Sequence, residues 1–212
     1  FLTAFITTRG FRDIASLQRH GRTNVYDLQY RKPEPVVRRR DSFEVAERVE
    51  GDGTVLQPLD EEDVRARLVP ILREGGYQAV AICLLNAYVN PAHEQALRTL
   101  IQSALPDINV TLSSDITREF REYERASTTA LSAYVQPVMD RYVARFDQRL
   151  AEAGFTGRFS VMQSNGGKLP AKAMRANAIT ALLSGPAAGV MGAARQAGRA
   201  GYRHLITLDI GG

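Results

Sequence analysis

Cysteine is almost missing from this chain of 212 residues, which contains only Cys83. No disulfide can therefore form within the chain, and such usage fits a reducing compartment, so we expect a cytoplasmic location. Cys83 stands inside the apolar run 79–85. We interpret it as a buried small residue rather than a nucleophile.

Long hydrophobic stretches are missing as well, since no apolar run reaches the roughly 18 residues that can span a bilayer. We therefore expect no membrane partner. The net charge is only +4. The basic run 38–40 lies beside Pro33 and Pro35, without an aromatic stacking platform, so we interpret it as a solvated connector and expect no nucleic-acid partner.

The familiar catalytic motifs are also absent. The chain has no Walker loop, no dinucleotide-binding fingerprint and no convincing Ser-His-Asp set. His93 has no second ligand at zinc spacing, and we interpret it as a surface or capping residue. With 44% hydrophobic and 24% charged residues, the composition is nevertheless that of an ordinary globular protein.

Apolar periodicity and capping residues predict an α/β fold. We expect helices over 13–20, 60–75, 90–105, 122–153 and 184–199. We expect strands over 3–9, 36–37, 43–49, 78–85, 108–112, 158–163, 178–183 and 204–209. Because helices and strands alternate from residue 60 to residue 112, those strands should pair in parallel.

The start of the last predicted helix is a candidate anion site. Ser184 is a suitable cap, and the free amides of a helix start attract negative charge. The same pattern also fits a tight strand-to-helix turn that packs closely. The candidate residues are Ser184, Gly185, Pro186, Ala187, Ala188 and Gly189.

A second candidate follows the strand predicted over 158–163. In open α/β sheets, ligands bind at the carboxyl ends of strands. An ordinary surface turn remains the alternative, because Asn-Gly is a common turn pair. The candidate residues are Ser164, Asn165, Gly166 and Gly167.

The third candidate is the end of the chain, where a predicted strand leads into Asp209, Ile210, Gly211 and Gly212. Glycines let a backbone approach phosphate, and an acid can reach a hydrated cation. Since the first residue is Phe1 rather than Met, we interpret the chain as an internal fragment that ends inside a phosphate site.

Two charged segments complete the candidates. Arg121 and Glu122 lie in the dense run 118–125, where a solvated helix start with internal ion pairs is the alternative. Arg12 and Asp13 follow the first strand, where a turn with an Arg–Asp pair is the alternative. We name these four residues as candidates for contact with a substrate.

Several blocks, in this order along the chain, together resemble the hydantoinase A / 5-oxoprolinase family. They are 7–13, 26–28 with 32–35, 84–94, 121–129, 163–167 and 184–190, and 209–212 matches the start of the family's second phosphate motif. The segment 17–22 departs from the family's usual Gly-Arg-Gln, which leaves the substrate class open.

The resemblance implies an actin-like ATPase (ribonuclease H-like) fold, of which this chain would hold most of the first lobe and the crossing into the second. Residues 1–129 would be the N-terminal-type region without its first phosphate motif, and 130–212 the start of the hydantoinase A-type domain. ATP and Mg2+ would be the cofactors. Asp209 would hold Mg2+ through water, and Gly211 and Gly212 would approach phosphate, with the two loops described above lining the nucleotide cleft.

The family's known activities are ATP-coupled openings of cyclic amides such as 5-oxoproline and hydantoins. The resemblance implies an enzyme that phosphorylates the amide oxygen of a small cyclic amide before water attacks. An acetone-type carboxylase subunit and a non-catalytic actin-like module remain alternatives. The parent protein would form an oligomer and could have a hydantoinase B-type subunit or domain as partner, whereas the fragment alone should be inactive.

Overall fold

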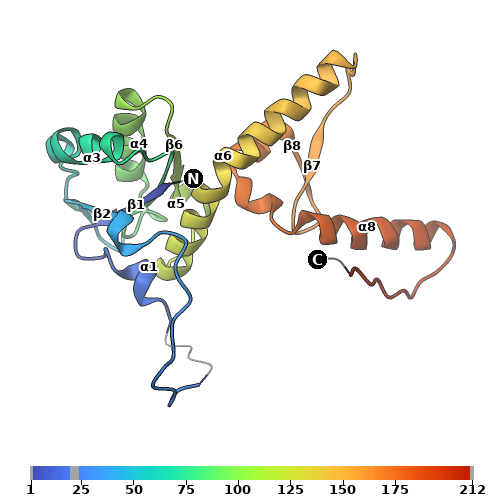
Figure 1. Ribbon diagram of the computed structural model, residues 1–212, viewed down its shortest axis with the longest axis horizontal. Coiled ribbons are helices and arrows are strands. Elements are labelled where there is room, and N and C mark those ends of the chain that lie inside the picture. Colours follow the sequence, from blue (N-terminus) through green and yellow to red (C-terminus); the bar gives the residue numbers. More distant parts are fainter. Residues whose placement is uncertain (1, 20–23, 211–212) are drawn as a thin grey trace. The chain divides into compact units, whose positions relative to one another are not determined.

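A computed structural model describes residues 2–19 and 24–210, without the side chains of residues 172, 175 and 176. The chain divides into two compact units, residues 1–137 and residues 138–212, each of which is described by itself (Figure 1). No helix of the described part is long and apolar enough to cross a membrane.

The first unit is built on a four-stranded sheet whose neighbouring strands are all parallel. Parallel pairing was predicted for the two strands between residues 60 and 112, and it is confirmed there. All residues of its two central strands are buried, which explains their nearly uninterrupted runs of apolar residues and threonine. The carboxyl ends of the strands meet at one edge of the sheet, here called the carboxyl edge. In order across the sheet, the strands are β2 (Ser42–Val45), β1 (Thr3–Thr8), β5 (Ala79–Cys83) and β6 (Asn109–Leu112).

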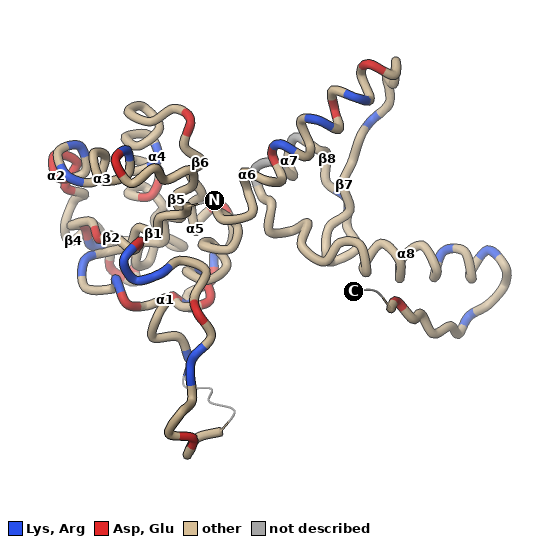
Figure 2. The backbone as a smooth tube through the Cα atoms, in the orientation of Figure 1, with Lys and Arg blue, Asp and Glu red and all other residues tan. Residues whose placement is uncertain are grey.

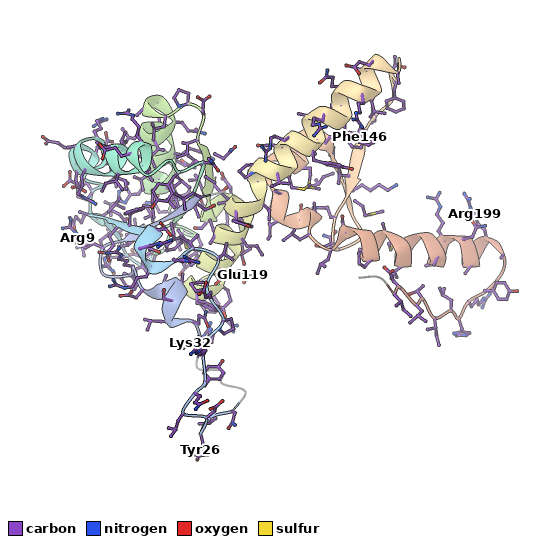
Figure 3. All side chains as sticks on the ribbon, viewed as in Figure 1. Arg9, Tyr26, Lys32, Glu119, Phe146 and Arg199 are labelled. Carbon is purple, nitrogen blue, oxygen red and sulfur yellow. The ribbon has the colours of Figure 1, made fainter. Side chains whose placement is uncertain are left out.

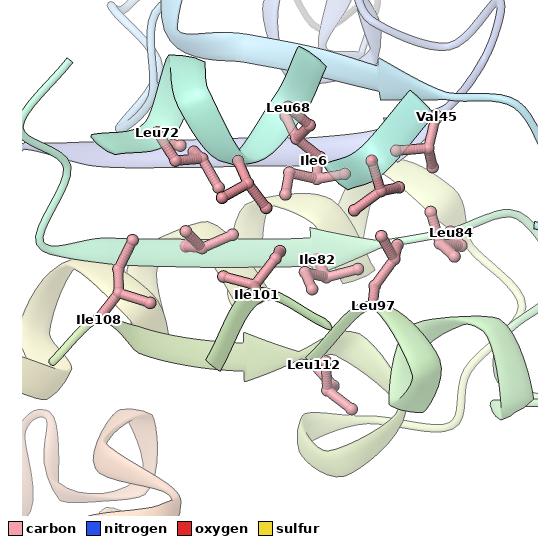
Figure 4. Packing of buried hydrophobic residues seen from close by; sticks show 14 of the residues in the cluster. Ile6, Val45, Leu68, Leu72, Ile82, Leu84, Leu97, Ile101, Ile108 and Leu112 are labelled. Atoms are coloured by element: carbon pink, nitrogen blue, oxygen red, sulfur yellow. The ribbon is translucent and has the colours of Figure 1, made fainter. Parts of the chain in front are cut away.

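Helical segments pack on one face of this sheet around the main hydrophobic core (Figure 4). The segment over 61–74 contributes Val64, Leu68 and Leu72, which are all fully buried. Its parts are α2 (Glu61–Asp63), a π-helical turn η2 (Val64–Leu68) and α3 (Val69–Glu74).

The ends and the interruption of these helices follow from single residues. The Asp60 carboxylate accepts the N–H of Asp63 at 3.0 Å and so caps α2. The π turn ends two residues before Pro70, which has no N–H to continue the α-helical pattern. Asn90 accepts the N–H of Ala92 at 3.1 Å at the start of α4 (Ala92–Ala104), which buries Leu97 and Ile101 in the same core.

The other face of the sheet is covered by the first part of the long helix α6 (Glu122–Glu152). Its contact residues are Ala126, Ala130 and Ala133, at helical spacing, and they pack against Phe5 and Cys83. Alanine at these positions lets the helix approach the sheet closely. The remaining elements of this unit are α1 (Ile14–Leu17), the 3-10 helix η1 (Arg39–Asp41), the antiparallel pair β3 (Arg48–Val49) and β4 (Val55–Gln57), and α5 (Ser113–Ile116).

The boundary between the units falls after Pro137, inside α6. In the second unit, Phe146 of α6 stacks on Phe159 with the ring centroids 4.7 Å apart. Basic and acidic residues follow one another along this part of the helix (Figure 2). The other elements of the unit are a hairpin of β7 (Ser160–Met162) and β8 (Lys168–Pro170), α7 (Ala171–Ala176), the 3-10 helix η3 (Ala178–Ala181) and α8 (Ser184–Arg199).

Four strand predictions are wrong, over 36–37, 43–49, 178–183 and 204–209. Residues 36–37 lie between Pro35 and η1 without forming a strand, because Pro35 has no N–H to donate to a ladder. Residues 178–183 contain η3 instead, where the Thr180 hydroxyl donates to the carbonyl of Asn177 at 2.9 Å. The strand expected over 43–49 is divided into β2 and β3.

The prediction of a strand over 204–209 is wrong for a different reason. This segment forms no strand, because none of the described residues pairs with it. Its apolar side chains are exposed, with Ile206 97% and Leu208 82% accessible. The alternation of the sequence therefore marks a segment able to form a strand, whereas a strand requires a neighbour that accepts its hydrogen bonds.

Candidate functional site

Polar side chains gather at the carboxyl edge of the first unit. The hydroxyl of Thr8 donates to one oxygen of Glu47, and the N–H of Leu85 donates to the same hydroxyl at 2.9 Å. The other Glu47 oxygen lies 2.7 Å from Nδ1 of His93. The Glu47 side chain is fully buried, and that of His93 is only 12% exposed. His93 is therefore an oriented partner of a buried acid, which the interpretation as a surface or capping residue missed.

Glu94, the next residue, is also completely buried. One carboxylate oxygen accepts the N–H of Leu84 at 3.0 Å and the hydroxyl of Ser113 at 2.6 Å. The other oxygen accepts the N–H and the hydroxyl of Ser114 at 3.0 and 2.7 Å. Glu94 thus joins the start of α4 to the ends of β5 and β6.

Arg125 of α6 completes this network and is itself fully buried. Its Nη2 donates to the carbonyl of Leu84 at 3.1 Å and to the Ser113 hydroxyl at 2.6 Å, and lies 4.0 Å from Glu94. Its guanidinium also lies over the ring of Tyr88, 5.4 Å from the centroid. Nε and Nη1 have no partner among the described residues. A buried charge requires such a counter-charge, so Glu94 and Arg125 depend on each other.

The four predicted substrate residues do not share one pocket. Arg12 lines an open pocket beside β2, together with Arg9 and Arg67. Asp13 forms an ion pair with Arg39 rather than with Arg12, and this hydrogen bond lowers the pKa of the Asp13 carboxyl.

The other two lie at the start of α6. Glu122 lines a narrow cavity with Phe11 and Cys83. Arg121 is exposed and places its guanidinium 5.8 Å from the ring centroid of Phe120. Arg125, four residues further along the helix, is buried instead. Burial raises the pKa of the Cys83 thiol to about 12, which agrees with a structural rather than a nucleophilic cysteine.

In the second unit, the segment Ser164 to Gly167 forms the turn of the β7–β8 hairpin, and β8 was not predicted. The side chain of Asn165 accepts the N–H of Gly167 at 2.8 Å, and Gly166 adopts a φ of +83°. The N–H of Ser164 donates to the carbonyl of Thr180 at 2.8 Å. The turn lies against α8, because a Cβ at Gly166 would meet Cγ of Met191 at 3.2 Å.

The first turn of α8 has open backbone. Ser184 is its first residue and not its cap, since Leu183 takes the capping position with a φ of +60° and no side chain caps the helix. A Cβ at Gly185 or Gly189 would meet nothing within 4 Å. The helix has no buried residue, although close packing was one reading of its sequence, and its first half carries no charge (Figure 2). Pro186, Ala187 and Ala188 lie in the same first turns.

The last candidate residues have different outcomes. Asp209 is exposed in the segment that turns back after α8 (Figure 1). Gly211 and Gly212 lie outside the described residues. In the described part of the chain, no group of three or more His, Cys, Asp or Glu residues could hold a metal ion.

Comparison with known proteins assigns the family. Residues 2–105 match the model of the hydantoinase/oxoprolinase N-terminal region, and residues 125–212 match that of hydantoinase/oxoprolinase. The chain belongs to the hydantoinase/oxoprolinase family.

Similar proteins include the caprolactamase subunit alpha of Pseudomonas jessenii, which is 37% identical over 187 residues, covering 88% of this chain and 27% of that protein. The acetophenone carboxylase gamma subunit of Aromatoleum aromaticum is 34% identical over 186 residues, covering 85% and 25%. The crystal structure of the ATP-dependent caprolactamase from Pseudomonas jessenii matches with a TM-score of 0.83 and 34% identity, over 99% of this chain and 30% of that one.

These matches have two consequences. The α/β fold with its parallel sheet is consistent with an actin-like ATPase fold, as the resemblance implied. The chain spans less than a third of the length of these relatives.

The residues that sequence reasoning missed at the carboxyl edge share a signal. Glu94 stands three and seven residues before Leu97 and Ile101, the buried residues of α4. Arg125 likewise precedes Thr129 and Ser132, which are also buried. A charged residue that continues the inward face of a helix indicates a buried ion pair.

Proposed function

We propose that this chain is part of an ATP-dependent enzyme that opens a small cyclic amide after phosphorylating its carbonyl oxygen. The observation that carries the proposal is the likeness to the ATP-dependent caprolactamase over 99% of the chain. The matched family is named for hydantoinase and oxoprolinase, whose names also denote cyclic amides.

The second unit fits an anionic nucleotide. The open space around Gly185 and the missing side-chain cap leave the free amides of the first turn of α8, which begins at Ser184, available to phosphate. The turn from Ser164 to Gly167 lies against the same helix. We propose that these two segments line the nucleotide site, and that Gly211 and Gly212 belong to it.

Asp209 fits a water-mediated contact with Mg2+. Magnesium keeps several waters and is bound through one or two carboxylates together with substrate phosphates, so a single exposed acid suffices on the protein side. When bound, ATP would supply the phosphoryl group that activates the amide carbon for attack by water, after which the C–N bond of the ring breaks and phosphate is released. The residues of this chain would position the reacting groups and neutralise the charge of the phosphates. Phosphoryl transfer depends mostly on these two contributions.

We further propose Arg12, Asp13, Arg121 and Glu122 as residues near the substrate, and regions 1–129 and 130–212 as the two family regions. A cytoplasmic location and an oligomeric parent protein also remain predictions. A partner of the hydantoinase B type is supported by relatives that are named as subunits.

A carboxylase subunit is the second candidate, favoured by the 34% identity to a subunit of acetophenone carboxylase. A non-catalytic actin-like nucleotide-binding module is the third. All three bind a nucleotide, and they differ in what stimulates phosphate release.

The test follows phosphate release from Mg-ATP by the full-length protein with any partner subunit. The additions are caprolactam, 5-oxoproline, hydantoin, and acetophenone or acetone with bicarbonate. Stimulation by a cyclic amide, together with its ring-opened product, supports the proposal. Stimulation by a ketone with bicarbonate alone would assign the carboxylase, and ATP binding without any stimulation would assign the non-catalytic module.

A further inference from the structure

A pocket with three arginines opens beside the edge strand β2. It has a volume of about 210 Å3, and we call it the arginine pocket. Two of its arginines follow β1 at the carboxyl edge, and the third comes from the π turn η2. Figure 3 places Arg9 at the outer surface of the first unit. The lining residues are Arg9, Arg12, Ser42, Phe43, Glu44 and Arg67.

The three guanidinium groups have donors to spare. Arg12 uses Nε and Nη2 to donate to the carbonyl of Arg39, at 3.3 and 3.1 Å. Arg67 uses the same two nitrogens for Asp63, at 2.8 and 2.6 Å, and Nη2 also reaches the carbonyl of Glu44. In the described part of the chain, Arg9 makes no side-chain hydrogen bond or ion pair. A guanidinium has five N–H donors. All five donors of Arg9 are therefore available to a ligand, and so are the Nη1 donors of Arg12 and Arg67.

The acidic member of the pocket is held in place by backbone. One oxygen of Glu44 accepts the N–H of Gly10 at 2.7 Å and that of Arg12 at 3.2 Å. Gly10 has a φ of +93°, a conformation that glycine adopts without strain, and so lets the loop after β1 turn toward this carboxylate. Glu44 therefore fixes the shape of the loop that carries Arg9 and Arg12. The two backbone N–H groups that it accepts stabilise its negative charge.

Charge and size together select the ligand. Glu44 offsets one of the three cations and Asp63 offsets Arg67, so the pocket retains a charge suited to a monoanion rather than a dianion. Its volume lies below the roughly 300 Å3 at which pockets begin to hold drug-sized ligands, which favours a small acid over a whole nucleotide. The open fork of Arg9 matches the two oxygens of a carboxylate.

We propose that the arginine pocket binds the carboxylate of a small organic acid, with Arg9 as its bidentate partner and Arg12 as a second donor. In the proposed enzyme the occupant would be a cyclic amide that carries a carboxylate, an assignment that rests on the proposed function. Arg9 belongs to block 7–13 of the family resemblance, but the sequence analysis did not name it as a candidate site residue.

The test measures binding by calorimetry to the full-length protein without ATP. The probes are 5-oxoproline and 2-pyrrolidinone, which are the same five-membered lactam with and without a carboxylate. We expect 5-oxoproline to bind roughly 10- to 100-fold more tightly, as charged hydrogen bonds provide. Arg9→Gln should abolish the difference in affinity between the two lactams. It should not shift the thermal unfolding midpoint, because the Arg9 side chain makes no hydrogen bond or ion pair with another described residue.

Arg65→Gln is the matched control. Arg65 lies in the π turn η2, as Arg67 does, but it forms an ion pair with Glu61 and does not line the pocket. It should leave both affinities unchanged. Equal binding of the two lactams, or an unchanged 5-oxoproline affinity in Arg9→Gln, would overturn the proposal. The proposal would also be overturned if inorganic phosphate bound, and lost its affinity in Arg9→Gln, while 5-oxoproline did not bind. Failure of amide-stimulated phosphate release would reject the proposed function alone, because these titrations contain no ATP.

Discussion

Glu94 and Arg125 show how much a single buried charge can require of its neighbours. Each is fully buried, and each owes its counter-charge to the other. Removing one partner of a buried pair leaves the other charge uncompensated, which costs far more than the loss of an exposed pair.

We therefore expect Glu94→Gln to lower the free energy of unfolding of the first unit by about 3–5 kcal/mol. The amide keeps the shape of the side chain but supplies no negative charge to Arg125. Chemical denaturation of the full-length protein measures the change. Glu61→Gln, in an exposed pair with Arg65, is the control and should cost less than about 1 kcal/mol. An effect of Glu94→Gln as small as that of the control would contradict a buried pair.

Cys83 supplies a second prediction at this scale. Burial raises the pKa of its thiol to about 12, so at pH 8 the folded protein holds the unreactive thiol form. Iodoacetamide should modify the peptide that contains Cys83 far more slowly in native than in unfolded protein, as mass spectrometry can follow. Similar rates in both states would show that the thiol is accessible.

The sign of the pH dependence follows from the same shift. The folded-state pKa is raised, so the contribution of Cys83 to stability is complete below its ordinary pKa of about 9 and is lost as the pH rises toward 12. Cys83→Ala should remove that part of the alkaline loss of stability, which unfolding measured across this pH range would detect.

At the scale of elements, the hairpin turn and α8 depend on one glycine. Gly166 has a positive φ, and a Cβ at this position would lie only 3.2 Å from Cγ of Met191. Gly166→Ala should lower the stability of the second unit by about 1 kcal/mol or more, because alanine is strained at this φ and the Met191 side chain must shift. Gly192→Ala is the control, since this helical glycine has open space around it, and it should raise stability by about 0.5–1 kcal/mol. Thermal unfolding of both variants tests the pair, and equal effects would argue against the turn–helix contact.

The elements that could be predicted from the sequence are those whose signals are local. The apolar runs of β1 and β5, the cap at Asp60 and the Asn90–Pro91 start of α4 all specify structure within a few residues. The failures concern partners. The alternation over 204–209 predicts a strand but not the neighbour that it needs, and the turn at Asn165–Gly166 does not reveal that β8 follows.

The candidate site was predictable to a similar degree. The glycine-rich turn and the start of α8 could be singled out from the sequence, and the structure brings the turn against that helix. Arg9 and Arg67 are 58 positions apart in the sequence, and Glu47 and His93 are 46 apart. Only the folding of the parallel sheet brings the members of each pair together.

At the scale of the whole molecule, the chain spans less than a third of its relatives, and the apolar side chains at 205–210 are exposed. We expect the chain produced alone to release no phosphate from ATP and to self-associate, because exposed apolar surface favours association. Sedimentation and a phosphate assay, run beside the full-length protein, test this. Turnover by a monomeric chain would contradict it.

The register of the central strands also has a consequence during synthesis. Thr3 of β1 pairs with Ala79 of β5, so β1 leaves the ribosome about 75 residues before its second neighbour. At translation rates of about 5–20 residues per second, this strand, whose residues are all buried in the folded protein, is made roughly 4–15 s before that partner. The parallel order that builds the carboxyl edge thus makes the nascent chain a candidate client for chaperones that shield unpaired strands.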